Sequence, residues 1–131
     1  MNYGYSLVRG AIARSLVAYG LIPCFGIHHK NQLNAFNLAD DMIEPFRAFV
    51  DVVVYEMYEE SFEDICQRKH RFIKEDKNRL YELFGVKAKI DNYETTLLNC
   101  CDIVSSSLAN ATKSKKSEDI SLPSLDVYES L

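Results

Sequence analysis

Apolar residues recur at steps of three and four along most of this chain, which is the spacing that places them on one face of an α-helix. Residues 2–19 show this repeat first and predict a helix. Gly20 and Pro23 follow, and because both residue types interrupt helices, we expect the helix to end there. Its apolar positions are Tyr5, Val8, Ile12, Leu16 and Tyr19.

Residues 24–34 are rich in types that favour turns and predict a loop, after which residues 35–58 predict the main helix of the chain. Pro45 lies inside this second helix. Proline has no backbone N–H to donate to the carbonyl of Asp41, one turn earlier, so we expect a kink there. The apolar stripe of this helix consists of Met42, Phe46, Phe49, Val50, Val53 and Met57.

Shorter elements are predicted for the middle and the end of the chain. They are helices over residues 61–73, 76–84 and 92–111, with a brief extended segment over residues 86–90. Gly85 ends the second of these helices. The third has an apolar side formed by Leu97, Cys101, Val104 and Leu108. The pattern as a whole predicts an all-α fold.

The last part of the chain changes character twice. Residues 113–119 are polar and charged and predict a flexible linker. Residues 120–131 are more apolar and contain Pro123, which favours extended chain over helix. We therefore expect one helical unit over residues 1–112, followed by a linker and tail over residues 113–131. The tail either packs on the helices or docks on a partner protein, and the sequence leaves both open.

Composition narrows the class of protein. A chain of 131 residues with 47% apolar content is long and apolar enough for one packed domain. The net charge of -4 gives no global sign of nucleic-acid binding. Locally, residues 51–64 are acidic without a base, whereas residues 68–79 are mainly basic. This fits either two solvated helix faces of opposite sign or a local basic patch.

The 4 cysteines form no CxxC pair, and Cys100 and Cys101 are adjacent, which is a poor geometry for a disulfide. We therefore expect reduced thiols packed in the core and a cytoplasmic protein. The longest apolar run, residues 16–27, is interrupted and too short to span a bilayer, so we expect no membrane partner.

The polar residues of the predicted helix over residues 35–58 gather opposite its apolar stripe. Asp41 and Glu44 are three residues apart, so their carboxylates can converge on one point above the helix. Like charges at this spacing repel unless a cation compensates, which either Arg47 or a divalent ion could do. A solvated polar face would show the same pattern. The other residues of this face are Asp40 and Asp51.

Two adjacent histidines lie in the loop that leads to these carboxylates. Side chains of adjacent residues in extended chain point opposite ways, so we expect at most one of His28 and His29 to face the carboxylates. One imidazole with carboxylate oxygens suits Mg²⁺ or Mn²⁺. A zinc site that uses Cys24 with His28 stays open, although it lacks a second CxxC or HxxxH element.

Four short motifs then follow one another in order. They are Asn-x-x-Tyr at residues 2–5, Gly-Leu-x-Pro at 20–23, Gly-x-x-His at 26–29 and Asp-Met-Ile-Glu-Pro-Phe-Arg at 41–47. With these motifs the chain resembles the CRISPR adaptation integrase, the nuclease-integrase of spacer acquisition. The resemblance is close over residues 2–51, where GIHH…NAFNLADD has the form typical of type II systems, and looser beyond.

The resemblance implies a fold and a metal site. The family has an N-terminal β-domain followed by a helical catalytic domain, so this chain would be the helical C-terminal portion, with the β-domain absent. Family members hold Mg²⁺ or Mn²⁺ with a glutamate, a histidine and a second acid. The matching residues here are His29 and Glu44, with Asp41 as a further ligand or an orienting residue. The first glutamate would lie upstream of Met1, so the isolated fragment would be inactive.

The resemblance also implies an activity, namely insertion of short double-stranded DNA into the repeat array by transesterification, together with cutting of branched DNA. The implied partners are double-stranded DNA, a second copy in a homodimer and a small ferredoxin-like adaptation protein. The candidates to contact DNA phosphates are Arg9, Arg14, Lys30 and Arg47. The alternative is a catalytically inactive helical module for binding or dimerisation.

Overall fold

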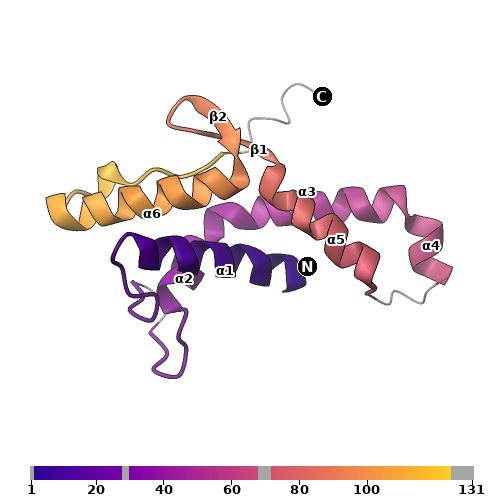
Figure 1. Ribbon diagram of the computed structural model, residues 1–131, viewed down its shortest axis with the longest axis horizontal. Helices are drawn as coiled ribbons and strands as arrows, with labels where there is room; N and C mark the ends of the chain where they lie inside the picture. The colour runs from indigo at the N-terminus through magenta and orange to yellow at the C-terminus, as the bar shows by residue number, and fades with distance from the viewer. Residues whose placement is uncertain (1, 28–29, 68–71, 125–131) are drawn as a thin grey trace.

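The computed structural model describes residues 2–27, 30–67 and 72–124, and over these residues it confirms a mainly helical chain with a small β-hairpin (Figure 1). The helices are α1 (Asn2–Ala18), α2 (Asn37–Met42), α3 (Glu44–Glu60), α4 (Phe62–Gln67), α5 (Lys74–Tyr81) and α6 (Leu97–Ser114), with the 3₁₀ turns η1 (Glu82–Gly85) and η2 (Ser117–Asp119). Strands β1 (Lys87–Ile90) and β2 (Tyr93–Thr96) pair antiparallel.

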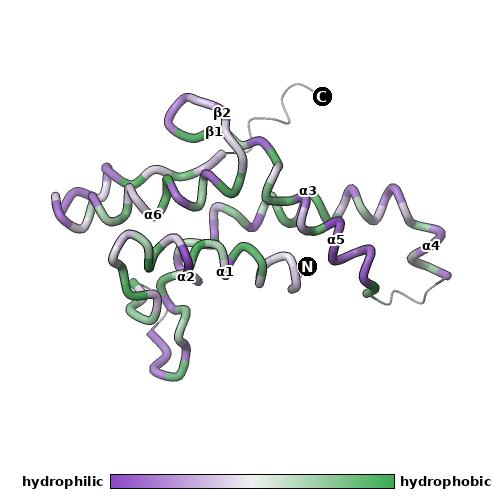
Figure 2. The backbone as a smooth tube through the Cα atoms, in the orientation of Figure 1, coloured by the Kyte–Doolittle hydropathy of each residue, from purple (hydrophilic) through white to green (hydrophobic). Residues whose placement is uncertain are grey.

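Helix α1 forms the centre of the packing and contacts α2, α3, α5 and α6. Val8, Ile12 and Leu16 are fully buried, which confirms the predicted apolar face. Tyr19 is exposed, because α1 ends at Ala18 and Gly20 turns the chain away with a φ of 81°. Figure 2 shows hydrophobic and hydrophilic residues mixed along α1, α3 and α6, whereas α5 is largely hydrophilic.

The predicted helix over residues 35–58 is divided into two helices at Ile43. Pro45 lies in the first turn of α3, where its missing N–H needs no helical partner. In place of one kinked helix the chain forms α2 and α3, which are separated by Ile43 alone; the backbone of Ile43 stays in the right-handed helical region. The apolar stripe continues across this break, with Met42 and Phe46 both buried in the core.

The prediction of helix from residue 92 onward is wrong for its first five residues. Asp91 and Asn92 have φ values of 50° and 68°, so the chain makes a left-handed turn and returns as β2. Aspartate and asparagine tolerate this conformation better than most residues, and such pairs favour tight hairpins. Helix α6 begins only at Leu97, where the Thr96 hydroxyl accepts a hydrogen bond from the backbone N–H of Asn99 at 3.3 Å.

The predicted helix over residues 61–73 is confirmed only in part. Helix α4 ends at Gln67, residues 68–71 lie outside the described part of the chain, and Ile73 is extended. The Ile73 backbone N–H donates to the Asp76 carboxylate at 3.0 Å, which starts α5 at Lys74. Helix α5 and η1 together run to Gly85, as predicted for the helix that this glycine ends.

Helix α6 confirms its predicted apolar side, because all its predicted residues are buried, namely Leu97, Cys101, Val104 and Leu108. The prediction that all cysteines pack in the core is half wrong, because Cys24 and Cys66 are exposed. Cys100 and Cys101 are buried against the neighbouring helices. Burial raises the pKa of the Cys101 thiol to about 12, and that of Cys100 upward as well.

The described part of the tail is extended, as Pro123 predicted, and it packs back on the chain. The backbone N–H of Ser121 donates to the Ser107 hydroxyl of α6 at 2.9 Å. Ser124 and Lys89 of β1 exchange backbone hydrogen bonds of 2.8 and 3.3 Å, and Pro123 is buried. The boundary after residue 112 stays a prediction, as does any docking by residues 125–131, which lie outside the described part.

Among the described helices, none has the length and apolar character that crossing a membrane requires.

Candidate metal and nucleic-acid site

The two carboxylates of the predicted metal site lie on either side of the break between α2 and α3. Asp41 belongs to the last turn of α2, and Glu44 is the first residue of α3. The Asp41 carboxylate accepts a hydrogen bond from the backbone N–H of Ile27. His28 and His29 follow Ile27 directly but lie outside the described residues. Asp41 therefore fastens the loop to α2 at the residue that precedes the histidines.

Glu44 extends toward solvent, with 60% of its side chain exposed. Its Oε1 atom accepts a hydrogen bond from Nε of Arg47, one turn later on α3, at 3.0 Å. Hard oxygen donors of this kind are the ligands that Mg²⁺ and Mn²⁺ prefer, so the donor chemistry of Asp41 and Glu44 fits such an ion. Within the described ranges no three His, Cys, Asp or Glu residues are grouped to hold a metal. The zinc alternative uses His28, which lies outside these ranges, and stays a prediction.

Asp40 was expected on the same polar face as Glu44, but it takes part in a different cluster. Its carboxylate lies 2.8 Å from Nε of Arg9 on α1 and accepts a 2.7 Å hydrogen bond from the Asn34 side chain. Arg9 also donates to Asn34 at 2.9 Å, and its guanidinium lies 4.4 Å from the centre of the Phe36 ring. We call Arg9, Asn34 and Asp40 the loop clamp, because it joins α1, the loop and α2.

The loop clamp changes the picture of Arg9 as a DNA contact. The Arg9 guanidinium is engaged by a carboxylate, an amide and an aromatic ring, and only 35% of its side chain is exposed. A phosphate would have to compete with these contacts. Arg14 and Lys30 are exposed, and Lys30 lies directly after the histidines. Their role in DNA binding stays a prediction, as does that of Arg9.

Asn37 is a residue whose importance the sequence patterns did not reveal. Its side chain is 3% exposed and donates to the backbone carbonyls of Cys24 and Asn31, at 3.0 and 2.7 Å. It therefore holds together two distant parts of the loop, which surrounds a cavity of about 400 Å³. A polar residue at the start of a helix resembles many solvated ones, so the sequence carries no signal that this one is buried.

A second cluster forms around Tyr5, the tyrosine of the Asn-x-x-Tyr motif. Its hydroxyl donates a hydrogen bond to Asp51 of α3, and this bond is the main reason why the pKa of the phenol is raised. The guanidinium of Arg47 lies 4.9 Å from the centre of the Tyr5 ring. Tyr5 thus connects α1 to the same side of α3 that carries Glu44, an arrangement that needs the packing of two helices.

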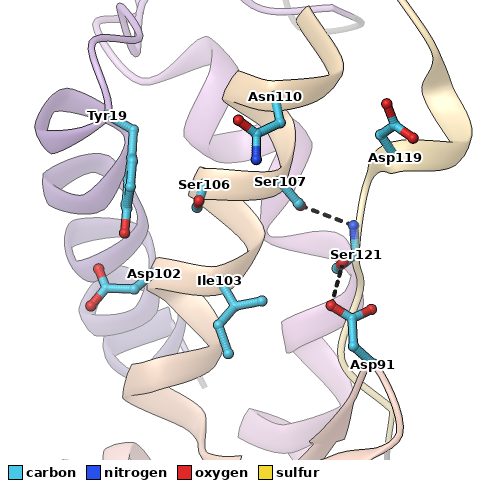
Figure 3. A pocket seen from close by; sticks show the side chains of 9 residues that line it. All are labelled: Tyr19, Asp91, Asp102, Ile103, Ser106, Ser107, Asn110, Asp119 and Ser121. Carbon is cyan, nitrogen blue, oxygen red and sulfur yellow. Dashed lines mark hydrogen bonds between the residues drawn. The ribbon is translucent and has the colours of Figure 1, made fainter. Parts of the chain in front are cut away.

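A polar groove of about 540 Å³ lies away from these carboxylates, between the end of α1, helix α6 and the segment that follows it (Figure 3). Each of its three aspartates accepts a hydrogen bond from a serine. The pairs are Asp102 with Ser15 at 2.7 Å, Asp91 with Ser121 at 2.7 Å and Asp119 with Ser114 at 2.6 Å. These bonds fasten the tail and α1 to the rest of the chain.

The family model for CRISPR associated protein Cas1 matches residues 1–95. The chain is 32% identical over 125 residues to the CRISPR-associated endonuclease Cas1 of Neisseria meningitidis serogroup C (strain 8013), a match that covers 95% of this chain and 40% of the relative. It is also 37% identical over 54 residues to a CRISPR-associated endonuclease Cas1 of Pyrobaculum aerophilum, covering 41% of this chain and 18% of that relative.

A further relative, from Thermodesulfovibrio yellowstonii, shows the same 37% identity over 54 residues. The chain spans about two fifths of the length of the Neisseria relative, so the matched region is a part of that protein. The family match covers well over half of the present chain and includes all four motifs. This chain therefore belongs to the Cas1 family of CRISPR-associated proteins.

Proposed function

We propose that this chain supplies His29, Glu44 and Asp41 to the divalent-metal site of a Cas1 endonuclease that also integrates DNA. The observation that carries the proposal is the placement of Asp41 and Glu44 at the break between α2 and α3, with Asp41 bonded to Ile27 next to the histidines. The relatives are named endonucleases, which supports the reaction class. Metal dependence and integration are our inference.

We assign the following roles to residues of this chain. His29 and Glu44 hold Mg²⁺ or Mn²⁺, while Asp41 is a further ligand or keeps the loop in place through Ile27. A bound ion would supply charge neutralisation at the reacting phosphate and would help to orient the attacking 3′-hydroxyl. Arg14 and Lys30, both exposed, attract the DNA backbone.

The proposed partners are double-stranded DNA, a second Cas1 copy and a small ferredoxin-like adaptation protein. A helical binding or dimerisation module without activity remains the alternative. DNA cleavage that is lost when His29 or Glu44 is replaced would support the endonuclease over the inactive binding module.

The test uses the full-length protein that carries this sequence. We expect His29→Ala and Glu44→Ala each to abolish integration and cleavage of branched DNA and to weaken Mn²⁺ binding, whereas His28→Ala costs much less. Glu63→Ala is the matched control, since Glu63 is an exposed acid on α4, outside the site. Equal losses for His28→Ala and His29→Ala would show that the ligand is assigned wrongly or that both are needed.

The 131-residue chain by itself should leave branched DNA intact in the presence of Mn²⁺. The ligands proposed on this chain are fewer than the set that the family resemblance implies, so they would hold the ion weakly and leave it hydrated. Cleavage is followed on a labelled branched substrate at a large excess of protein. Robust cutting by the 131-residue chain that is lost in His29→Ala would contradict this prediction. It would show that residues within the chain complete a metal site.

A further inference from the structure

Glu44 and Arg47 form an ion pair one turn apart at the start of α3, with Nε and Oε1 separated by 3.0 Å. The two side chains are 60% and 42% exposed, respectively. A pair of this kind on an exposed helix usually forms and breaks freely, because water competes for both charges and two long side chains lose freedom. By itself the pair would therefore do little to orient Glu44.

Arg47 has a second contact that distinguishes it from an ordinary surface arginine. Its guanidinium lies 4.9 Å from the centre of the Tyr5 ring, within the range of a cation–π interaction. Tyr5 comes from α1, so this contact joins the arginine to a neighbouring helix. The planar guanidinium can stack on the ring and still direct Nε at a carboxylate, which the ammonium group of lysine cannot do in the same way.

The Tyr5 ring is itself held in place. Its hydroxyl donates to the Asp51 carboxylate, and Asp51 lies one turn beyond Arg47 on α3. Arg47 thus has two contacts that restrict it. It donates a hydrogen bond to the Glu44 carboxylate, and it lies against the Tyr5 ring, which Asp51 fastens to α3. Restricting the arginine in this way also restricts the Glu44 carboxylate that accepts its hydrogen bond.

We infer that Arg47 is a positioning residue that holds the Glu44 carboxylate ready for the divalent ion, and that Tyr5 keeps Arg47 in place. The inference rests on the proposed function, since it assumes that Glu44 is a metal ligand. Arg47 acts on the ion only through Glu44. From the sequence, Arg47 was expected either to contact DNA or to compensate the charge of Asp41 and Glu44; the inference adds a positioning role to the second of these.

The direction of the effect on metal affinity separates positioning from simple electrostatics. A positive charge beside a metal ligand repels the ion, so on charge alone Arg47→Ala should tighten Mn²⁺ binding. If Arg47 positions Glu44, its removal should weaken binding instead, by about ten-fold, as is typical when the hydrogen-bond partner of a ligand is lost. A merely structural role would change thermal stability and leave the affinity of the folded protein as it was.

The experiment measures free Mn²⁺ by electron paramagnetic resonance during titration of the full-length protein, with no DNA present. Arg47→Ala and Arg47→Gln both remove the charge, but only glutamine keeps an N–H donor near Glu44. We expect Arg47→Ala to bind Mn²⁺ about ten-fold more weakly than wild type, with Arg47→Gln in between. Tyr5→Leu should weaken binding more than Tyr5→Phe, which keeps the ring.

Arg79→Ala is the matched control, because Arg79 pairs with Glu82 three residues later and with Glu60 at the opposite end of α3 from Glu44. It should leave Mn²⁺ affinity unchanged. Unchanged or tighter binding in both Arg47 variants would overturn the inference. If circular dichroism shows that Arg47→Ala lowers the folded fraction, the inference is tested by comparing the Mn²⁺ affinity of Arg47→Gln with that of wild type. Glu44→Gln reports on the proposed function separately, since unchanged affinity in that variant would remove Glu44 from the site altogether.

Discussion

The guanidinium of Arg9 lies 2.8 Å from the carboxylate of Asp40, and this ion pair connects the middle of α1 to α2 across the whole intervening loop. Asn34, from the loop itself, bonds to both partners. The loop that carries the histidines is therefore fixed near its end by the loop clamp and at Ile27 by Asp41. These contacts hold described loop residues on both sides of the two histidines.

The loop clamp predicts coupled losses of stability. Arg9→Ala and Asp40→Ala should each lower the free energy of unfolding by about 1–3 kcal/mol, because each leaves a partly buried charged partner without its bond. The double variant should lose less than the sum of the two, and urea unfolding of all four proteins measures the difference. Strict additivity would mean that the two side chains do not interact in solution.

Gly4 predicts a steric effect where α1 meets α3. A Cβ atom at this position would come within 2.7 Å of Cγ1 of Val50, so Gly4→Ala forces the helices or the valine to move. We expect a loss of about 1–3 kcal/mol in the free energy of unfolding, as for other overpacked cores. Gly10→Ala, in the same helix with open space around it, should instead gain up to about 1 kcal/mol.

The cysteines predict a pattern of chemical reactivity. Cys24 and Cys66 are exposed, whereas Cys101 is buried with a pKa of about 12, so its thiol stays protonated at neutral pH. Iodoacetamide at pH 8 should modify the two exposed residues in the native protein and reach Cys100 and Cys101 only after unfolding. Peptide mass mapping gives the site of each adduct. Rapid native labelling at Cys101 would contradict the packing of α6 described above.

The tail predicts a difference between two deletions in the full-length protein. Removing residues 125–131 leaves the bridge between Ser124 and Lys89. Removing residues 120–131 eliminates this bridge, the hydrogen bond from Ser121 to Ser107 of α6 and the buried Pro123. We expect both deletions to keep the proposed homodimer and to weaken binding of the proposed ferredoxin-like partner, with lower thermal stability only for the longer one. Size-exclusion chromatography and a pull-down measure these effects. Unchanged assembly and integration in both would rule the docking role out.

The sequence by itself determined the buried faces of α1, α3 and α6, because an apolar repeat of three and four residues places its members on one side of a helix. The interruption at Ile43 was expected from Pro45, because proline has no N–H to continue the preceding helix. The family motifs selected His29, Glu44 and Asp41, and the structure places Asp41 and Glu44 on the two sides of that break. His29 lies outside the described residues, so its role as a ligand stays a prediction.

Tertiary structure decided which polar groups meet. On the helical wheel Asp40 and Glu44 look equivalent, yet Asp40 pairs with Arg9 and Glu44 with Arg47. The turn at Asp91 and Asn92 also depended on the sheet. Two successive residues with positive φ are favoured in a hairpin because the turn matches the twist of the two paired strands. Local periodicity reports what a segment buries, whereas the partners of its polar atoms come from segments distant in the sequence.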